Sequence, residues 1–485
     1  MQKQSLKSQA LAGSAWTLGG YTVAQVVRLG SHLVLAWLLD PKMFGLMALV
    51  KVVQHGLGMF SDIGILPSII RSKRGDDPVF LCTAWTIQVM RGIALWICAC
   101  ILAWPLAAVF SRNDPAAWQL LQLLPVAGFG AVLEGLNSPV LATLNRDLRF
   151  GRMTLLELGK QLTAVVVMIV WGYFSPTAWA LVAGGLAGSA FGALLSHFLV
   201  PGFRVRFAWN RDCVSEIAHF GKWIFLSTAF TFLAINLDKL ILGNLVTLEH
   251  LGVYSIAFVF AKVPQYVGMR LSSKVLFPIY ATFRSDAERM VSVALKARGL
   301  VLLLGMAVCC CLAVAGPLFF ESLWDPRYHE AGNITQWMSL YIWTTLIQQT
   351  MSRIPLALGN SRAMFYSNVW MCTGSLLAIG GYYLAALPGF ISGLAMGPVI
   401  SHMYLLRHVP AGRLALFRQS VRFTLVAVAY GMSAVLATNF VRSWVSELAW
   451  AAMVVTLAVT PVLVVGVVVL RKVRGEQRSQ VAKGS

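Results

Sequence analysis

Apolar stretches of bilayer length follow one another along almost the whole chain, and no other feature constrains the fold as strongly. A membrane core about 30 Å thick is spanned by a helix of about 20 apolar residues. No segment between these stretches is long enough to form a separate soluble domain. Only 12% of the 485 residues are charged, whereas soluble domains have about 25%. The sequence therefore predicts an all-α, polytopic membrane protein with about 14 transmembrane helices.

The apolar runs also give the approximate limits of these helices. Each limit is expected to be correct within about 2–4 residues. The predicted spans are 14–38, 42–66, 81–109, 116–143, 153–174, 177–200, 219–243, 249–279, 291–319, 333–357, 363–386, 388–406, 420–439 and 444–470.

Basic residues divide the connections between these spans into two alternating sets. One set holds 24 Lys and Arg residues and the other holds 4, and the alternation never reverses. Cytoplasmic loops of membrane proteins are enriched in Lys and Arg. We therefore expect an even number of helices and both termini in the cytoplasm. The net charge of +20 is attributed to this orientation signal, not to nucleic-acid binding.

A displacement of 207 residues aligns the start of the second half of the chain with the start of the first. Gly45 then falls on Gly252, and Arg91 falls on Arg298. An even number of intervening helices gives both copies the same orientation in the membrane, which predicts two six-helix lobes related by a parallel pseudo-twofold axis. The expected domains are an N-lobe at 1–200, a basic cytoplasmic linker at 201–222, a C-lobe at 223–410, and two further helices with a basic tail at 411–485.

Ionisable residues occur at helical spacing in the first two helices of each half. A charge at bilayer depth costs about 2.5–3.5 kcal/mol on insertion scales, so it tends to face a cavity or a partner. We predict that these helix faces line a water-filled, cationic cavity that binds an anionic head group. The candidate binding residues are Arg28, His32, Lys51, His55, Asn236, Lys239, Lys262 and Arg270.

Two simpler interpretations compete with a cavity. Long basic side chains near the cytoplasmic ends of helices can extend to the membrane surface or form ion pairs inside the protein, and these interpretations are favoured for Arg91 and Arg298. Asp238 can form a local pair with Lys239, although neighbouring side chains diverge by about 100° on a helix.

Few acidic residues lie inside the predicted spans. Asp62, Glu134 and Asp238 are the candidates for proton or sodium coupling. Glu134 is followed by Asn137 and Pro139, which can kink this helix.

Motifs of several enzyme classes do not occur in the sequence. There is no GxxxxGK[ST] phosphate-binding loop and no HExxH zinc motif. The eight cysteines do not show metal-binding spacing. We therefore expect a protein that is not an enzyme and that has no metal site and no cofactor.

Several short motifs support a family assignment. They are AGSAW at 12–16, LLDPKMFG at 38–45, LNRDLRF at 144–150, FGKW at 220–223, NLDK at 236–239 and LGVYSIA at 251–257. They resemble motifs of the polysaccharide transporters, in particular the O-antigen and exopolysaccharide flippases of the multidrug/oligosaccharidyl-lipid/polysaccharide exporter superfamily. The resemblance covers roughly residues 5–290, and the final third is similar mainly in helix number.

The resemblance implies a flippase of the bacterial inner membrane. Such proteins move undecaprenyl-diphosphate-linked sugar repeat units to the outer leaflet by alternating access, for O-antigen, capsule or exopolysaccharide synthesis. The expected partners are this lipid-linked oligosaccharide, membrane lipid, and the polysaccharide polymerase and export machinery.

Two alternatives remain open. One is a cation-coupled multidrug exporter of the same superfamily, which the mainly basic charge inside the spans disfavours. The other is a membrane-embedded polysaccharide polymerase or ligase, which is expected to need a large outer loop. The longest such loop predicted here covers only about residues 320–332.

Overall fold

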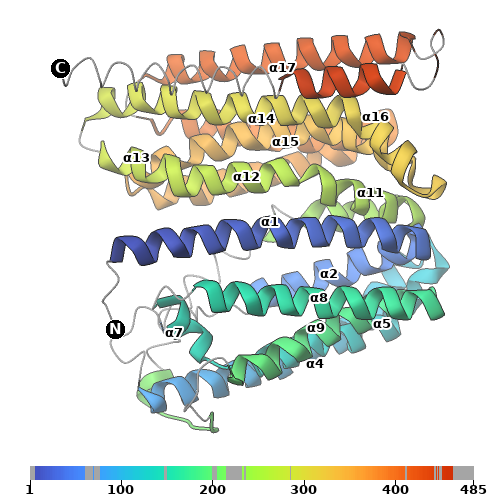
Figure 1. Ribbon diagram of the computed structural model, residues 1–485, viewed down its shortest axis with the longest axis vertical. Coiled ribbons are helices and arrows are strands. Elements are labelled where there is room, and N and C mark those ends of the chain that lie inside the picture. The colour runs from blue at the N-terminus through green and yellow to red at the C-terminus, as the bar shows by residue number, and fades with distance from the viewer. Residues whose placement is uncertain are drawn as a thin grey trace. The chain divides into compact units, whose positions relative to one another are not determined.

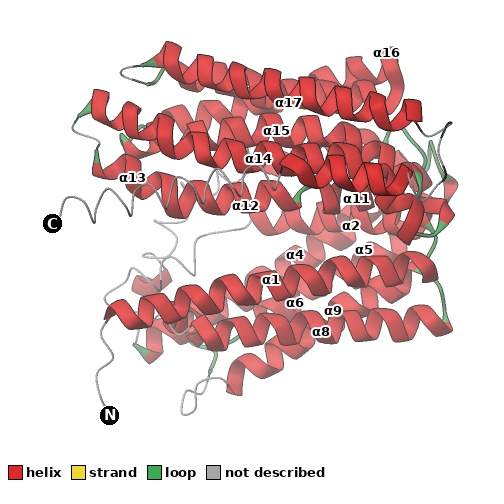
Figure 2. Cartoon of the chain, turned by 45° about the horizontal axis from the view of Figure 1, so that its top comes forward, coloured by secondary structure: helices red, strands yellow, loops and turns green. Residues whose placement is uncertain are grey.

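The computed structural model is helical wherever it describes the chain. Within the described ranges every regular element is a helix (Figures 1 and 2). Seven of these helices are long and apolar enough to cross a membrane. The predicted all-α, polytopic class is therefore confirmed. The described residues are 6–60, 69, 77–146, 150–198, 205–214, 232–233, 236–283, 286–409, 412–441, 444, 446 and 450–461.

The long helices lie where the apolar runs predict membrane spans. The first half contains α1 (Leu6–Leu38), α2 (Pro41–Phe60), α4 (Pro78–Phe110), α8 (Phe150–Phe174) and α9 (Ala178–Phe198). The second half contains α14 (Ala287–Leu323), α15 (Glu330–Ala357), α16 (Ser361–Leu406), α17 (Arg413–Val441) and a shorter helix at Trp450–Pro461. The total of about 14 stays a prediction, because the spans 42–66, 219–243 and 444–470 lie partly outside the described residues.

The chain divides into two compact units, Met1–Ser255 and Ile256–Ser485. The division falls within α11 (Leu248–Ala261). The lobe and linker boundaries expected from the sequence stay a prediction, because most of the region around 201–235 lies outside the described residues.

In the N-terminal unit, α8 packs between α1 and α9 (Figure 1). Gln161 of α8 donates a hydrogen bond to the Ala24 carbonyl of α1 at 2.7 Å. On the other side, a Cβ atom at Gly188 of α9 would lie 2.8 Å from the Lys160 carbonyl oxygen. Small residues and interhelical hydrogen bonds therefore hold these helices together, as is usual where lipid removes the hydrophobic driving force.

The fourth predicted helix, residues 116–143, is broken into short pieces. They are η1 (Pro115–Gln119), α5 (Leu120–Gly128), α6 (Gly130–Gly135) and α7 (Val140–Arg146), so the predicted kink in this helix is confirmed. Side chains of neighbouring helices donate to its carbonyl groups: Gln54 to Ala127 at 2.6 Å and Gln88 to Glu134 at 3.0 Å. Irregular backbone at membrane depth is tolerated where protein buries it or where it lines a cavity.

In the C-terminal unit, α16 contains two antiparallel halves, which match the eleventh and twelfth predicted helices. The chain reverses at Ala385 and Ala386, and Ala386 has a φ of 49°. Close contact of Gly381 with the Gly389 backbone packs the two halves against each other. The short predicted connection around Pro388 is therefore a tight turn.

The eighth predicted helix is also irregular. After α11 it continues as α12 (Val263–Leu271), a π-helical turn, η2 (Ser272–Leu276), and α13 (Phe277–Thr282). Pro264 lies at the start of α12, where its missing N–H is tolerated. A π-helical turn inside a helix is often found at a functional site.

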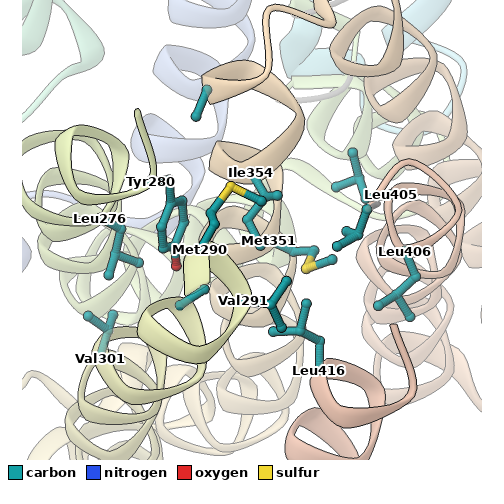
Figure 3. Close-up of a cluster of buried hydrophobic side chains, with 13 residues drawn as sticks. Leu276, Tyr280, Met290, Val291, Val301, Met351, Ile354, Leu405, Leu406 and Leu416 are labelled. Atoms are coloured by element: carbon teal, nitrogen blue, oxygen red, sulfur yellow. The ribbon is translucent and has the colours of Figure 1, made fainter. Parts of the chain in front are cut away.

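A cluster of buried apolar side chains joins η2 and the helices from α13 to α17 in the C-terminal unit (Figure 3). Tyr280 and Met290 come from α13 and α14, Met351 from α15, Leu405 from α16 and Leu416 from α17. All five are fully buried. This core therefore includes α17, which lies outside the predicted repeat.

Candidate functional site

Three of the predicted binding residues form a basic cluster in the N-terminal unit. Arg28 and His32 lie one turn apart on α1, and Lys51 comes from α2. The charges of Arg28 and Lys51 act on each other and on His32. Since like charges repel, an anionic group bound here would lower the energy of the cluster. His55 lies one turn after Lys51, and its ring is 6.4 Å from the ring of Phe232.

Asn236, Asp238 and Lys239 have partners within the protein. The Lys239 ammonium lies 3.6 Å from the Asp238 carboxylate, so the local pair considered from the sequence does form. The Tyr254 hydroxyl donates to Asp238 at 3.0 Å, and the Asn236 amide donates to the Phe232 carbonyl at 3.3 Å. These contacts explain the charges as part of the packing, and a binding or coupling role stays a prediction.

The C-terminal unit contains the remaining two predicted binding residues. The Lys262 ammonium lies 3.9 Å from the centre of the Phe258 ring, which is a cation–π contact. Arg270 belongs to α12, but its side chain is outside the described part of the structure, and so is the whole of Asp62.

A cavity of about 480 Å³, which we call the polar cavity, lies inside the N-terminal unit. Its charged lining consists of Lys51 from α2, Arg91 from α4 and Glu134 from α6. Arg91 donates to the Gly58 carbonyl at 2.8 Å. In the described part of the chain, the Glu134 carboxylate has neither a hydrogen bond nor an ion pair. The cavity thus brings together a predicted binding residue and a predicted coupling residue.

The Asp114 carboxylate connects three chain segments at one end of the helices, and we call this arrangement the Asp114 clamp. It accepts a hydrogen bond from the Ala116 N–H at 3.0 Å, and the Lys42 ammonium lies 3.1 Å away. Its second oxygen accepts from the Leu248 N–H, at the start of α11, at 3.4 Å. Burial alone would raise the pKa of Asp114, but the Ala116 N–H and the Lys42 ammonium outweigh it and hold the pKa below its ordinary value.

Beside this clamp, the repeat-related residues Gly45 and Gly252 bring two helices into backbone contact. A Cβ atom at Gly45 would overlap the Leu248 carbonyl oxygen, and a Cβ atom at Gly252 would overlap the Pro41 carbonyl oxygen. The contact is reciprocal, as a twofold relation between the two copies would give. Only glycine allows α2 and α11 to approach this closely.

Arg298 has a role that the sequence did not indicate. It is fully buried. Of the two interpretations favoured from the sequence, extension to the membrane surface is therefore wrong. It donates to the Thr350 hydroxyl at 3.0 Å, the Gln419 side-chain oxygen at 3.0 Å and the Ser420 hydroxyl at 2.8 Å. Two of these acceptors lie on α17, and no periodicity within α14 could have identified them.

No metal centre is found in the described part of the chain, where no group of three His, Cys, Asp or Glu side chains could hold a metal ion. The candidate functional features of the described residues are therefore the charge clusters and the polar cavity.

These helices, polar contacts and charge clusters define a multi-pass α-helical membrane protein. The chain belongs to the family described as polysaccharide biosynthesis proteins, whose family model matches residues 34–332, more than half of the sequence.

Curated relatives of this family come from several bacteria. The lipopolysaccharide biosynthesis protein WzxC of Escherichia coli (strain K12) is 26% identical over 291 residues, which cover 59% of this chain and 57% of WzxC. The succinoglycan biosynthesis transport protein ExoT of Rhizobium meliloti (strain 1021) is 24% identical over 53% of this chain and 50% of ExoT. The matched region thus spans little more than half the length of these relatives.

Solved structures show the same fold at low sequence identity. The lipid II flippase MurJ, in an inward closed conformation, matches with a TM-score of 0.72 and 13% identity over 94% of this chain and 99% of MurJ. An inward-facing multidrug resistance transporter of the MATE family matches with a TM-score of 0.65 and 12% identity over 83% of this chain and 95% of the transporter.

Proposed function

We propose that this protein is a lipid-linked oligosaccharide flippase of the bacterial inner membrane, and not an enzyme. It would move undecaprenyl-diphosphate-linked sugar repeat units to the outer leaflet for polysaccharide synthesis. The single observation that carries this proposal is the basic cluster of Arg28, His32 and Lys51, because repelling cations favour a ligand with an anionic head group. The family and the names of its curated relatives support a role in polysaccharide synthesis.

In this mechanism the diphosphate binds the basic cluster while the polyprenyl tail stays in lipid. A Lys ammonium binds phosphate as a point charge, and an Arg guanidinium can bind it through two parallel hydrogen bonds. The Asp114 clamp and the Gly45–Gly252 contact would close the outer side, and they would have to separate when the substrate leaves. Lys262 and Arg270 stay predicted binding residues for the same anionic head group.

The proposed orientation places both termini in the cytoplasm, in line with the positive-inside rule. A polysaccharide polymerase and the export machinery would act on the substrate after its release. We propose these partners because a repeat unit that has reached the outer leaflet must be consumed there.

The cation-coupled multidrug exporter is the second candidate, since the MATE transporter shares the fold. A cationic drug would be repelled by the basic cluster. Asp238, a carboxylate that could attract it, is paired with Lys239. The polymerase or ligase alternative lacks support in the region of its expected loop, where α14 ends at Leu323 and α15 begins at Glu330.

The test combines a gene deletion with a charge-reversal variant. In a deletion strain, leaflet-selective labelling and mass spectrometry should find the completed lipid-linked oligosaccharide on the cytoplasmic leaflet. The intact gene should reverse this accumulation, and an Arg28→Glu, Lys51→Glu double variant should fail to do so at normal protein level. Arg112→Glu, at an exposed connection, is the matched control and should restore export.

Two outcomes would overturn this proposal. If unpolymerised repeat units accumulated in the outer leaflet, the protein would act after translocation. If the double variant exported normally, the basic cluster would not be the anionic site.

A further inference from the structure

The polar cavity contains both donors and acceptors that lack hydrogen-bond partners among the described residues. They are the Lys51 ammonium, the Glu134 carboxylate and the side-chain oxygen of Asn137, and all three residues line the cavity. The Asn137 oxygen is also buried from solvent. A buried acceptor without a hydrogen bond is destabilising, so its presence calls for an explanation.

The mixture of charges decides which kind of ligand fits. An anion would be attracted by Lys51 and Arg91 but repelled by Glu134. A cation would meet the opposite difficulty, because two positive groups line the same space. A hydroxyl group both donates and accepts hydrogen bonds, so a neutral ligand with several hydroxyl groups satisfies both kinds of group at once.

The size and the apolar part of the lining agree with this ligand class. The cavity volume of about 480 Å³ falls in the range of about 300–1,000 Å³ typical of small-molecule pockets. Leu57, Leu95 and Leu186 contribute apolar surface to the cavity, against which the C–H groups of a sugar ring can pack. Ser189 adds a hydroxyl on α9.

The helices around the cavity are held in place by close backbone contacts. A Cβ atom at Gly92 would lie 2.6 Å from the Ala131 carbonyl oxygen, and one at Gly135 would lie 2.9 Å from the Gln88 carbonyl oxygen. These contacts fix α4 against α6, next to Glu134. Interrupted transmembrane helices commonly form the binding sites of transporters, and here the interrupted helix carries Glu134 and Asn137.

We propose that the polar cavity is a glycan-binding subsite, which takes a sugar residue of the lipid-linked oligosaccharide. Glu134 and Asn137 accept hydrogen bonds from its hydroxyl groups. This inference rests on the proposed flippase function and adds the part of the substrate that the protein recognises. A site built to hydrogen-bond hydroxyl groups discriminates strongly against ligands that lack them.

The experiment compares two lipids that differ only in the glycan. The full-length protein is placed in nanodiscs, and dissociation constants are measured by native mass spectrometry. One probe is undecaprenyl diphosphate, and the other is the lipid-linked oligosaccharide that accumulates in the deletion strain. The wild-type protein should bind the glycosylated lipid at least about tenfold more tightly, as expected from more than one added hydrogen bond.

Two variants test the subsite in different ways. Glu134→Ala removes an acceptor whose carboxylate has no partner in the described structure, and Gly185→Leu fills the cavity from a position where a Cβ atom meets nothing within 4 Å. Each should bring the ratio of the two affinities close to one. Glu157→Ala is the matched control, because Glu157 pairs with Lys160 on α8 and does not line the cavity.

Each outcome has one meaning. If the ratio stays unchanged in both variants, or if the wild-type protein does not distinguish the lipids, the glycan subsite is wrong. If a variant weakens both lipids equally, the cavity binds the diphosphate instead. If the wild-type protein binds neither lipid, the flippase proposal itself fails. The subsite would be established if Glu134→Ala and Gly185→Leu lost the preference for the glycosylated lipid while Glu157→Ala kept it.

Discussion

Arg91 and Arg298 occupy equivalent positions in the sequence repeat but different surroundings in the two units. Arg91 lines the polar cavity, where one guanidinium N–H is bonded to the Gly58 carbonyl. Arg298 is fully buried and bonded to side chains of α15 and α17. The N-terminal unit therefore keeps open, polar space around its arginine, whereas the C-terminal unit fills that space with an additional helix.

Unlike the two arginines, the equivalent glycines Gly45 and Gly252 have similar surroundings. These two residues are also related by the 207-residue displacement, and they make equivalent contacts with each other's helices. The equivalent glycines thus have similar surroundings, whereas the equivalent arginines do not. A reciprocal contact constrains both residues equally, but an interior can change together with its own neighbours.

The largest expected difference concerns the two arginines. Arg298→Met should lower the free energy of unfolding by about 3 kcal/mol, because it leaves several buried acceptors without a donor. Arg91→Met should lower it by less than about 1 kcal/mol, because its surroundings are an open cavity. Thermal unfolding of the purified protein in detergent measures both. Equal losses would show that the two arginines have the same structural role.

The glycine pair should give equal effects of intermediate size. Gly45→Ala and Gly252→Ala should each destabilise the protein by about 2 kcal/mol, since a Cβ atom would overlap a backbone oxygen of the other helix. Gly30→Ala is the matched control, because a Cβ atom there meets nothing within 4 Å. The same unfolding measurement applies. A large difference between the two substitutions would contradict the reciprocal contact.

The Asp114 clamp should give the smallest effect and should depend on pH. Asp114→Asn should cost about 1 kcal/mol, since Lys42 is partly exposed and solvent screens the pair. The pKa of Asp114 is below its ordinary value. The ionised Asp114 carboxylate therefore contributes its full stabilisation above about pH 5. This stabilisation is lost as the pH falls through the pKa of Asp114 in the folded protein, below about 4.

Unfolding measured from about pH 7 to pH 3 would test this dependence. The wild-type protein should lose its advantage over Asp114→Asn only in the acidic part of the range. If the advantage disappeared between pH 5 and 7 instead, the clamp would respond to another group, and Asp114 would not be the titrating residue.

The broken fourth helix illustrates how far sequence reasoning reaches. The apolar run at 116–143 correctly predicted a span, and the residues after Glu134 correctly predicted a kink. The sequence did not indicate that Gln54 and Gln88 donate to carbonyl groups of this segment. Those donors come from other helices, so their contribution depends on tertiary packing.

The candidate site was predicted in part. Helical spacing placed Arg28 and His32 on one face of a helix, and Lys51 was predicted for the same cavity. The structure gives a basic cluster of these three residues, and their binding role stays a prediction. The polar cavity was missed, because its lining comes from several helices, namely α2, α4, α5, α6, α8 and α9. Arg91 was interpreted as a residue that reaches the membrane surface or forms an ion pair inside the protein, and only the positions of its neighbours place it at a cavity.

The membrane-spanning helical class follows from the sequence alone, because a bilayer requires long apolar segments whose backbone groups are satisfied within each helix. The sequence repeat also identified Gly45 and Gly252 as equivalent positions. In contrast, the cavity beside Arg91 and the enclosure of Arg298 by α17 depend on how the helices pack. The physical reason is that burial and hydrogen-bond partners depend on side chains brought together from distant helices, whereas insertion into a membrane depends on each apolar segment separately.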